Sequence, residues 1–509
     1  MDLMRHLPII DLLVILLYFA GTMGLGLYFM RRSRDPEAFM AAERSLPSWL
    51  VGMSIFATYV SSISFLAIPG NAYQFNWSRF TFSLSIPFAA LVGSRFFVPL
   101  YRARAEVSAY SYLEHRFGPL ARSYAAAFYL LTQIVRMGSV MYLMALPFNS
   151  LLGWDIKTII LVTGISTTLY AMLGGIKGVI WTDAIQGFML IGGALLCAVL
   201  MFFGMPEGPG QIFSLAREHN KFSLGSFNLF DWTSATFWVI LLNGVFMNLQ
   251  NFGIDQNYVQ RYITARTDKQ AHRALWLGSL LYVPVSLIFF FIGTELYAYY
   301  TAQPALLPAG MQAEGMADRV FPYFIVTGLP VGVTGLLIAA VFAAAMSTIA
   351  TSLNSSATVV LTDFYKRHFR KNAGEKESMR VLYATSFLWG VMGMAVAIAM
   401  INVKSALDTW WMLSSIFSGG MLGLFLLGYF AQRATKTCAA AGMAFGLLII
   451  TWMSLSQMSF WRESTALRSY SSPFHSFLII VFGTLAIFLV GFLICLPASL
   501  KKKHSSGND

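Results

Sequence analysis

The feature that most constrains this chain is a series of apolar segments, each about twenty residues long, separated mostly by short polar turns. An α-helix rises ~1.5 Å per residue, so about twenty apolar residues cross the ~30 Å hydrocarbon layer of a membrane. Charged residues make up 11% of the chain, against roughly 25% in soluble proteins. The sequence therefore predicts an all-α polytopic membrane protein with about 13 transmembrane helices. The expected spans are 8–30, 48–69, 79–100, 123–149, 157–174, 178–203, 233–257, 273–300, 330–362, 380–402, 408–431, 437–457 and 474–497.

The net charge of +12 could suggest a nucleic-acid partner, but its distribution indicates membrane orientation instead. With the N-terminus outside, the cytoplasmic segments hold 24 of the 35 Lys and Arg residues, and the outside segments hold eight. Arg261, after the seventh span, is counted in the cytoplasmic set. Such an excess is the positive-inside pattern. We expect a multi-pass protein of the cell inner membrane, with a cytoplasmic C-terminus and no nucleic-acid partner.

The cysteines and histidines give no sign of a cross-linked or metal-binding protein. Cys197, Cys438 and Cys495 lie in or beside spans, and we expect them to be packing residues without a disulfide framework. All seven histidines fall in loops or at span ends, which disfavours a buried metal or haem site. The first span lacks the basic flank and cleavage site of a signal peptide, so we expect a retained helix.

Two spans contain too many polar residues for a continuous lipid-facing helix. The span 48–69 has five Ser and Thr residues in its middle, and the span 233–257 is polar in its second half. They lie five spans apart, which is the spacing that an inverted repeat of five helices predicts. In transporters with such a repeat, the two broken helices hold the cargo at the bilayer midplane. Serine and glycine also permit close helix packing, so for either span alone that interpretation remains open.

Two further spans carry groups that suit a cation. Asp183 lies a few residues into the sixth span, where it could ligate a cation or cap a helix that starts after the glycine-rich GGIKG segment. The ninth span carries a cluster of hydroxyl side chains: Ser347, Thr348, Thr351, Ser352, Ser355 and Ser356. A single hydroxyl would simply bond back to its own helix, but a group of them supplies the hard oxygen ligands that small cations need. The group favours a cation site, and the role of Asp183 stays open.

Arg136 lies in the middle of the fourth span, where an unpaired guanidinium costs ~2.5 kcal/mol or more. Asp183 and Asp255 are the acidic residues that could pair with it inside the protein. The planar fork of arginine also suits a carboxylate ligand. Because acidic partners are scarce, we favour an anionic ligand at Arg136.

Four runs resemble the sodium:solute symporter family: FATYVSSISFLAIP, GGIKGVIWTDAIQG, DQNYVQRY and FAAAMSTIATSLNS, in this order along nearly the whole chain. Through YLLTQIVR, GVIWTDAIQG, VQRYI and LLPAG the chain looks most similar to the bacterial sodium/sialic-acid members. The resemblance implies the inverted-repeat fold of the amino-acid transporter LeuT. It divides the single membrane domain into a leading helix at 8–30, five-helix repeats at 48–203 and 233–431, two trailing helices within 437–497 and a cytoplasmic tail at 498–509.

The resemblance also implies two sodium sites. The ligands of the main site would be the carbonyls of Ala57, Val60 and Ala344 and the hydroxyls of Ser347 and Thr348. Asp183, Ser347 and Thr351 match a second site. Ala350 stands where that site has another serine, which puts a two-sodium stoichiometry in doubt.

The substrate pocket that the resemblance implies carries over in part. Arg136 matches the arginine that holds the sialic-acid carboxylate, and Ser61 and Ser64 match hydroxyl positions beside it. Three positions depart from the family pattern: Tyr59 replaces a threonine, Arg79 a gating phenylalanine and Ser83 a glutamine. An added cation at Arg79 is compatible with an anionic sugar.

These features predict a secondary symporter that imports a small polar, anionic sugar, such as sialic acid or a related sugar acid, by alternating access. Sodium is the expected coupling ion, no other cofactor is expected, and a monomer is expected to contain the whole pathway. Symport of a neutral sugar or other solute, proton coupling and uniport remain alternatives. An intramembrane enzyme is disfavoured because the spans lack histidine and a nucleophile–base pair. A transporter-like sensor is disfavoured by the nine-residue tail after Leu500.

Overall fold

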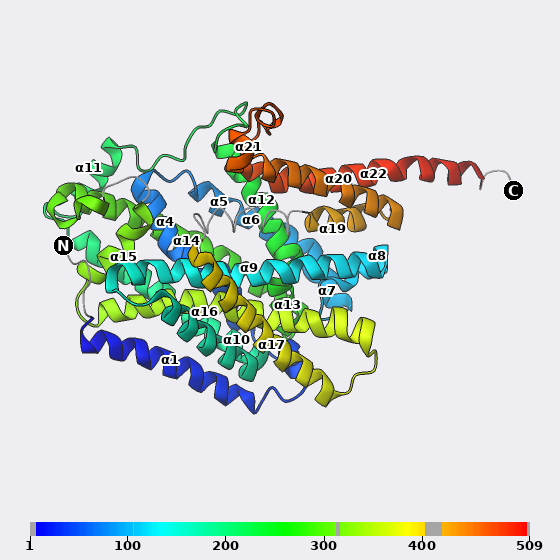
Figure 1. Ribbon diagram of the computed structural model, residues 1–509, viewed down its shortest axis with the longest axis horizontal. Coiled ribbons are helices and arrows are strands. Elements are labelled where there is room, and N and C mark those ends of the chain that lie inside the picture. Colours follow the sequence, from blue (N-terminus) through cyan, green and yellow to red (C-terminus); the bar gives the residue numbers. More distant parts are fainter. Residues whose placement is uncertain (1–6, 105, 312–315, 403–419, 506–509) are drawn as a thin grey trace.

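The computed structural model describes residues 7–104, 106–311, 316–402 and 420–505, most of them in helices (Figure 1). Its long helices are α1 (Ile9–Met30), α3 (Ser48–Tyr59), α4 (Ser62–Gln74), α9 (Pro119–Leu152), α10 (Ile156–Phe203), α12 (Phe237–Ile254), α13 (Gln256–Thr264), α14 (Asp268–Ala302), α16 (Val333–Val359), α17 (Glu375–Ala399), α19 (Met421–Phe430), α20 (Lys436–Leu455) and α22 (Ile479–Ser505). The third predicted span consists of α5 (Phe80–Leu84), α6 (Ile86–Val92), η2 (Gly93–Phe97) and α7 (Val98–Arg104). Short helices join these elements: α2 (Pro36–Ala41), η1 (Ala42–Arg44), α8 (Ser111–Phe117), α11 (Gly210–Glu218), η3 (Pro304–Leu306), η4 (Ala309–Met311), α15 (Ala317–Thr327), η5 (Val360–Phe369), η6 (Met400–Asn402), α21 (Ser459–Glu463), η7 (Arg468–Tyr470) and η8 (Ser476–Leu478).

Among the described residues, ten helices are long and apolar enough to span a membrane, and the bent pair α3–α4 adds an eleventh. The predicted spans 157–174 and 178–203 are counted as one because they form α10, which has 48 residues. At ~1.5 Å per residue such a helix is about twice as long as the hydrocarbon layer is thick. Gly175 interrupts α10 with a φ of 55°, a conformation that glycine adopts without strain. The predicted span 408–431 lies partly outside the described residues, so the expected count of 13 is not confirmed.

Both spans that the sequence marks as interrupted are broken. The axes of α3 and α4 differ by 55°, and the break at Val60 and Ser61 has extended backbone. The Ser61 hydroxyl accepts a hydrogen bond from the Ser64 backbone N–H and so caps α4. Asp255 separates α12 from α13 in the same way, and its carboxylate accepts from the Asn257 N–H at 2.8 Å. Each broken span therefore restarts at a side chain that supplies its own N-cap.

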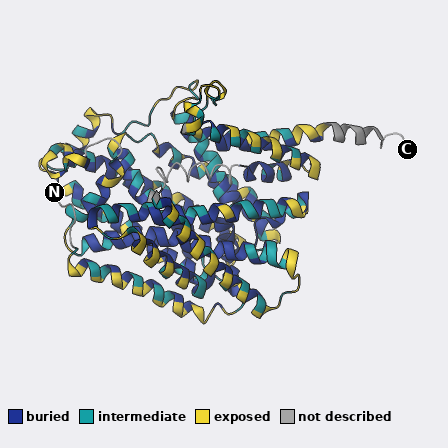
Figure 2. Ribbon diagram, in the orientation of Figure 1, coloured by how far each residue is buried: buried dark blue, intermediate teal, exposed yellow. Residues whose placement is uncertain are grey.

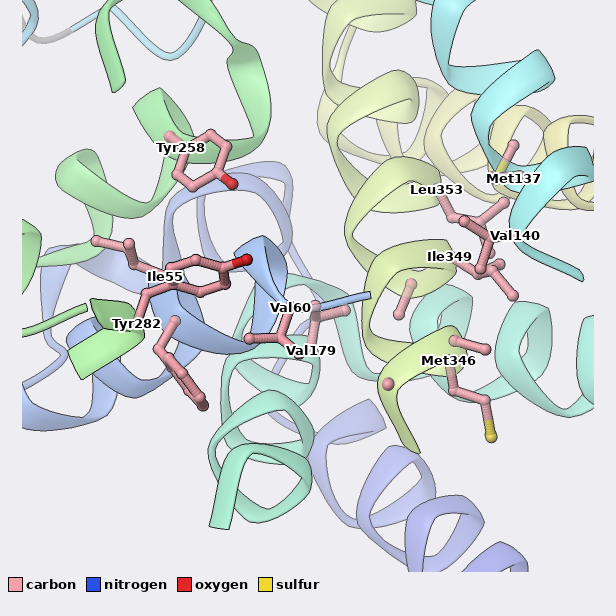
Figure 3. Close-up of a cluster of buried hydrophobic side chains, with 14 of the residues drawn as sticks. Ile55, Val60, Met137, Val140, Val179, Tyr258, Tyr282, Met346, Ile349 and Leu353 are labelled. Carbon is pink, nitrogen blue, oxygen red and sulfur yellow. The ribbon is translucent and has the colours of Figure 1, made fainter. Parts of the chain in front are cut away.

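The buried core is centred on α16, in which nearly every residue from Thr334 to Val359 is buried (Figure 2). In Figure 3, Ile349 and Leu353 of α16 point toward α9, whereas Val60 lies on the other side of α16. That other side contacts the break between α3 and α4. The central helix thus packs apolar side chains against α9, where Ser352 also bonds to Gln133, and it presents hydroxyl groups to the broken span.

The α14 helix packs along both halves of the first broken span, and two glycines allow the close approach. A Cβ on Gly278 would lie 2.6 Å from the Gly52 carbonyl of α3. A Cβ on Gly293 would lie 2.3 Å from the Pro69 carbonyl of α4. Any larger side chain at these positions requires the backbones to move apart.

The start of the first broken span and the end of the second pair through their backbones. The Leu46 N–H donates to the Thr264 carbonyl at 3.0 Å, and the Arg266 N–H donates to the Leu46 carbonyl at 3.2 Å. The Arg266 side chain adds a bond to the Ser45 carbonyl. These contacts tie the start of the first broken span to the end of the second.

The trailing helices α20 and α22 pack antiparallel along one edge of the bundle (Figure 1). A disulfide joins Cys438 to Cys495, so the expectation that these cysteines stay unpaired is wrong. The two residues are 57 apart in sequence, but the close helix packing brings their Cα atoms to 5.9 Å. Gly442 and Gly446 permit that packing, since a Cβ on either would collide with α22. Cys197 is a buried free thiol.

Candidate ion and solute site

Four of the five proposed ligands of the main sodium site lie together where α16 meets the end of α3. The Ser347 hydroxyl donates to the Ala57 carbonyl at 2.9 Å and approaches the Ala344 carbonyl at 3.3 Å. The Thr348 hydroxyl donates to the same Ala344 carbonyl at 3.2 Å. All four residues are buried. The structure therefore gathers uncharged oxygen atoms at a helix break, which suits a small alkali cation.

Val60, the fifth residue, is the C-cap of α3. Its extended backbone (φ −80°, ψ 116°) turns the chain away from the helical path before α4 begins. The residue is completely buried. Irregular backbone at membrane depth is tolerated only inside protein or beside a cavity, and here it adjoins the oxygen cluster.

Asp183 does not cap a helix, because it lies two turns beyond the break at Gly175 and is completely buried. One of its oxygens, Oδ2, accepts from Arg261 Nη2 at 2.6 Å and from the Ser54 hydroxyl at 2.5 Å. The other oxygen, Oδ1, has no hydrogen-bond partner among the described residues. Asp183 is thus paired with a cation supplied by the chain.

Arg261 is the residue whose position the charge count misjudged. It is completely buried in α13 and is not a cytoplasmic loop charge. Besides Asp183 it contacts the Ser54 hydroxyl at 2.7 Å and the Thr351 hydroxyl at 2.7 Å. The guanidinium therefore lies between Asp183 and Thr351, two residues proposed for the second sodium site. Ala350, also buried, adds no side-chain oxygen there.

Arg136 lies in the middle of α9 and is half-buried. Within the described part of the chain it forms no ion pair and no hydrogen bond through its side chain. It is the positive charge that interacts most strongly with the Asp255 carboxylate at the second helix break. Of the two acidic candidates considered from sequence, Asp183 is paired with Arg261, whereas Asp255 forms neither an ion pair nor a hydrogen bond with Arg136.

The other proposed substrate residues occupy different depths. Ser61 and Ser64 are half-buried at the first break, with their hydroxyl oxygens 3.3 Å apart. Tyr59 is also half-buried, and its hydroxyl donates to Asn248 in the second broken span. Arg79 is exposed, whereas Ser83, one turn further on, is buried and hydrogen-bonded to Ser286 of α14 at 2.7 Å. The structure thus groups Tyr59, Ser61 and Ser64 at the break, and it separates Arg79 from Ser83 by depth.

Some polar residues around the break were not selected from the sequence. Asn248 links the two broken spans, because it accepts from Tyr59 and donates to Ser85 at 3.0 Å. Gln133 of α9 accepts from Ser352 at 2.8 Å and from Asn257 at 3.2 Å. The polar character of both spans was a usable signal for these residues, but their partners lie far away in sequence.

Two broken helices that meet around a buried oxygen cluster define a secondary transporter of the alternating-access type. A family model narrows this class: it matches residues 39–446, and the chain belongs to the sodium:solute symporter family. The protein is a transporter and not an enzyme.

Individual relatives agree with this assignment. The sodium/sialic acid symporter NanT of Aliivibrio fischeri is 33% identical over 479 residues, 94% of this chain and 91% of the relative. The sodium/sialic acid symporter SiaT of Proteus mirabilis is 34% identical over 436 residues, 85% of this chain and 87% of the relative. A solved structure of a Na+-coupled sialic acid symporter, substrate-bound and outward-open, gives a TM-score of 0.87 at 32% identity, covering 96% of this chain and 97% of that one. The expected LeuT-type fold is confirmed.

Proposed function

We propose that this protein imports sialic acid, or a closely related anionic sugar, together with sodium. The observation that carries the proposal is Arg136, a half-buried guanidinium in the middle of α9 without an ion pair or hydrogen bond to the described residues. A charge in that position needs a compensating partner, and a carboxylate fits its planar fork. The names of the two bacterial relatives support sialic acid as the source of that carboxylate.

In this proposal Ser61 and Ser64 bind hydroxyl groups of the sugar beside Arg136. Tyr59 borders the same break, and its bond to Asn248 connects the pocket to the second broken span. Arg79 is exposed and would attract an anionic solute at the mouth of the pathway. Ser83 would act indirectly, by holding α5 against α14 through Ser286.

The main sodium site would use Ala57, Val60, Ala344, Ser347 and Thr348. Sodium there would replace the bond between the Ser347 hydroxyl and the Ala57 carbonyl and join α16 to the broken span. Ion and solute would then each raise the affinity for the other, since both stabilise the same arrangement of the break. Asp183, Ser347 and Thr351 would form a second site only if Arg261 withdrew, so we propose one sodium ion per cycle.

The transport cycle in this proposal is a rocking of the broken-span helices against the surrounding helices. The backbone pairing of Leu46 with Thr264 and Arg266 would close the cytoplasmic end until sodium and solute are bound. We propose further that the protein acts as a monomer in the inner membrane, with the N-terminus outside and the C-terminus in the cytoplasm. The division into repeats at 48–203 and 233–431 belongs to the same proposal.

The test is uptake of radiolabelled sialic acid into proteoliposomes, with and without an inward sodium gradient. We expect uptake by the wild type only with sodium, and at least a tenfold loss of apparent affinity in Arg136→Ala. A charge-assisted hydrogen bond contributes ~1.5–3 kcal/mol, and about 1.4 kcal/mol corresponds to tenfold. Arg217→Ala, which removes an exposed arginine of α11, is the matched control and should transport normally.

Each contrary result identifies the part of the proposal that fails. Uptake that is independent of sodium would refute the coupling ion. Unchanged affinity in Arg136→Ala would refute the carboxylate anchor. If sodium stabilises the purified protein against heat but sialic acid is not transported, the cargo is another sugar or acid.

A further inference from the structure

Glu295 carries a buried and isolated carboxyl group in the described part of the chain. It lies on α14, is 0% exposed, and neither of its oxygens has a hydrogen-bond partner among the described residues. Buried carboxylates normally require a cation or several donors. The transport mechanism proposed above does not use this residue.

Glu295 lies where α14 meets both the broken span and α10. Its neighbour Thr294 accepts from the Trp77 indole at 2.9 Å, and Gly293 lies against the Pro69 carbonyl of α4. Toward α10, Glu295 lies near the buried thiol of Cys197. One turn further along, Ala298 joins an apolar cluster with Met205 and Ile212. The carboxyl group is thus enclosed at the junction of α4, α10 and α11.

The neighbouring elements bring no charge to this junction. The helix α4 has no charged residue, and beyond Asp183 the only titratable side chain of α10 is Cys197. Other elements that pack on this half of α14 carry charged residues, but these are exposed. They are Arg217 and Glu218 of α11, Asp318 and Arg319 of α15, and Arg79, which precedes α5.

Other titratable groups nearby are not counter-ions either. His219 packs against the Tyr297 ring. Lys221 lies over the same ring and donates to carbonyls at the end of α4. Tyr73 packs on Tyr297, and Tyr299 and Tyr300 lie on α14 itself. The helices α3, α7 and α13 contact the opposite half of α14, where Arg102 pairs with Asp268 and Arg261 with Asp183. An ionised Glu295 would therefore lack a counter-ion among the described residues in this conformation.

We infer that Glu295 is a proton-binding site, loaded in this conformation and emptied when α14 and α10 move apart during the transport cycle. The inference rests on the proposed transport function. The group can ionise only where water or a cation reaches it, and the closed junction excludes both. Protonation of Glu295 then favours the closed arrangement of α14 and α10. Alkaline pH removes the proton, which makes the closed arrangement less populated and slows the cycle.

The first test needs no transported solute: infrared spectroscopy of the purified protein as a function of pH. We expect the carbonyl stretch of a protonated carboxyl that persists at neutral pH, is lost at alkaline pH and is missing in Glu295→Gln. Glu218→Gln, which alters an exposed carboxyl on α11, is the matched control and should retain the band. A band that Glu295→Gln leaves unchanged, or its absence from the wild type at neutral pH, would overturn the inference.

The second test measures initial uptake rates from about pH 6 to pH 9.5. We expect the wild-type rate to fall severalfold at the alkaline end and the Glu295→Gln rate to vary less than twofold, because the amide imitates the loaded state. Glu295→Asp should shift the midpoint, which provides a second variant if the glutamine protein does not fold. Coincident wild-type and Glu295→Gln profiles would overturn the inference. If the wild type does not take up sialic acid at any pH, the proposed function fails while the infrared result stands by itself.

Discussion

Ala350 is the residue that most directly separates one sodium ion per cycle from two. Replacing it with serine adds a hydroxyl beside Asp183 and Thr351, while Arg261 still lies between them. We expect a Hill coefficient for sodium of about 1 in the wild type, and a higher value in Ala350→Ser because the added hydroxyl would help sodium to displace Arg261 from Asp183. Sodium titration of uptake, or of thermal stabilisation, measures this. A wild-type coefficient near 2 would contradict the single-ion proposal.

The ion pair between Asp183 and Arg261 leads to a prediction about the free energy of unfolding. Asp183→Asn leaves a buried guanidinium without its counter-ion, which typically costs about 3–5 kcal/mol. We expect Arg261→Gln in the Asp183→Asn background to recover part of that loss, because the unpaired charge is removed. A double-mutant cycle of unfolding free energies in detergent measures the coupling. Additive effects of the two changes would show that the pair is not coupled.

Lys221 allows a prediction of pH dependence outside the membrane-spanning helices. Its ammonium donates to the carbonyls of Tyr73 at 2.6 Å and Phe75 at 3.1 Å, at the end of α4. Burial lowers the pKa of Lys221 from 10.5 to about 8. Between these values the unfolded chain binds more protons, so the contribution of Lys221 to stability rises with pH across that window. The difference in melting temperature between wild type and Lys221→Met should therefore change between about pH 8 and 10, and a constant difference would refute the prediction.

For single residues, the sequence indicated the candidate site residues better than it indicated the residues that they contact. The hydroxyl cluster of the ninth span and the position of Ser347 and Thr348 follow from composition and family resemblance. Arg261 could not be placed, because charge counting assigns any arginine beyond an apolar segment to a loop. Its burial depends on α13 folding back between α3 and α16, a long-range contact that leaves no periodic pattern in the sequence.

Among the elements, α14 sets the distance between the broken span and its support. Gly278→Ala puts a methyl group 2.6 Å from the Gly52 carbonyl, and overpacking of this kind costs about 1–3 kcal/mol. The matched control is Gly192→Ala in α10, where a Cβ has no atom within 4 Å. Both changes replace helical glycine by alanine, so the difference in their melting temperatures isolates the packing effect. Equal melting temperatures would show that α14 can shift without cost.

The sequence located most helices because their apolar runs are long, and it identified both broken spans because polar residues interrupt those runs. It placed a turn between two spans near Gly175, where α10 consists of two helices joined across a kink. The helix bends there and resumes within one residue, so no polar loop marks the boundary. The sequence missed the close pairing of α20 with α22, which depends on glycines meeting across two helices.

For the whole molecule, the orientation of the bundle can be tested directly. Glu218 on α11 and Phe369 at the end of η5 are both exposed, and the distribution of basic residues predicts that they face opposite compartments. We expect a membrane-impermeant maleimide to label Glu218→Cys in intact cells. Phe369→Cys should react only after permeabilisation. Reversed labelling would invert the proposed topology.

The bond between Cys438 and Cys495 has a consequence for any comparison of these measurements. Cys438 lies in the first turn of α20 and Cys495 near the end of α22, both at the end of the bundle predicted to face the cytoplasm. Thiols in that compartment are kept reduced, whereas a preparation handled in air is oxidised. The protein in the cell and the purified protein then differ by one covalent link between the trailing helices. Thiol state therefore has to be matched before melting temperatures from vesicles and from detergent are compared.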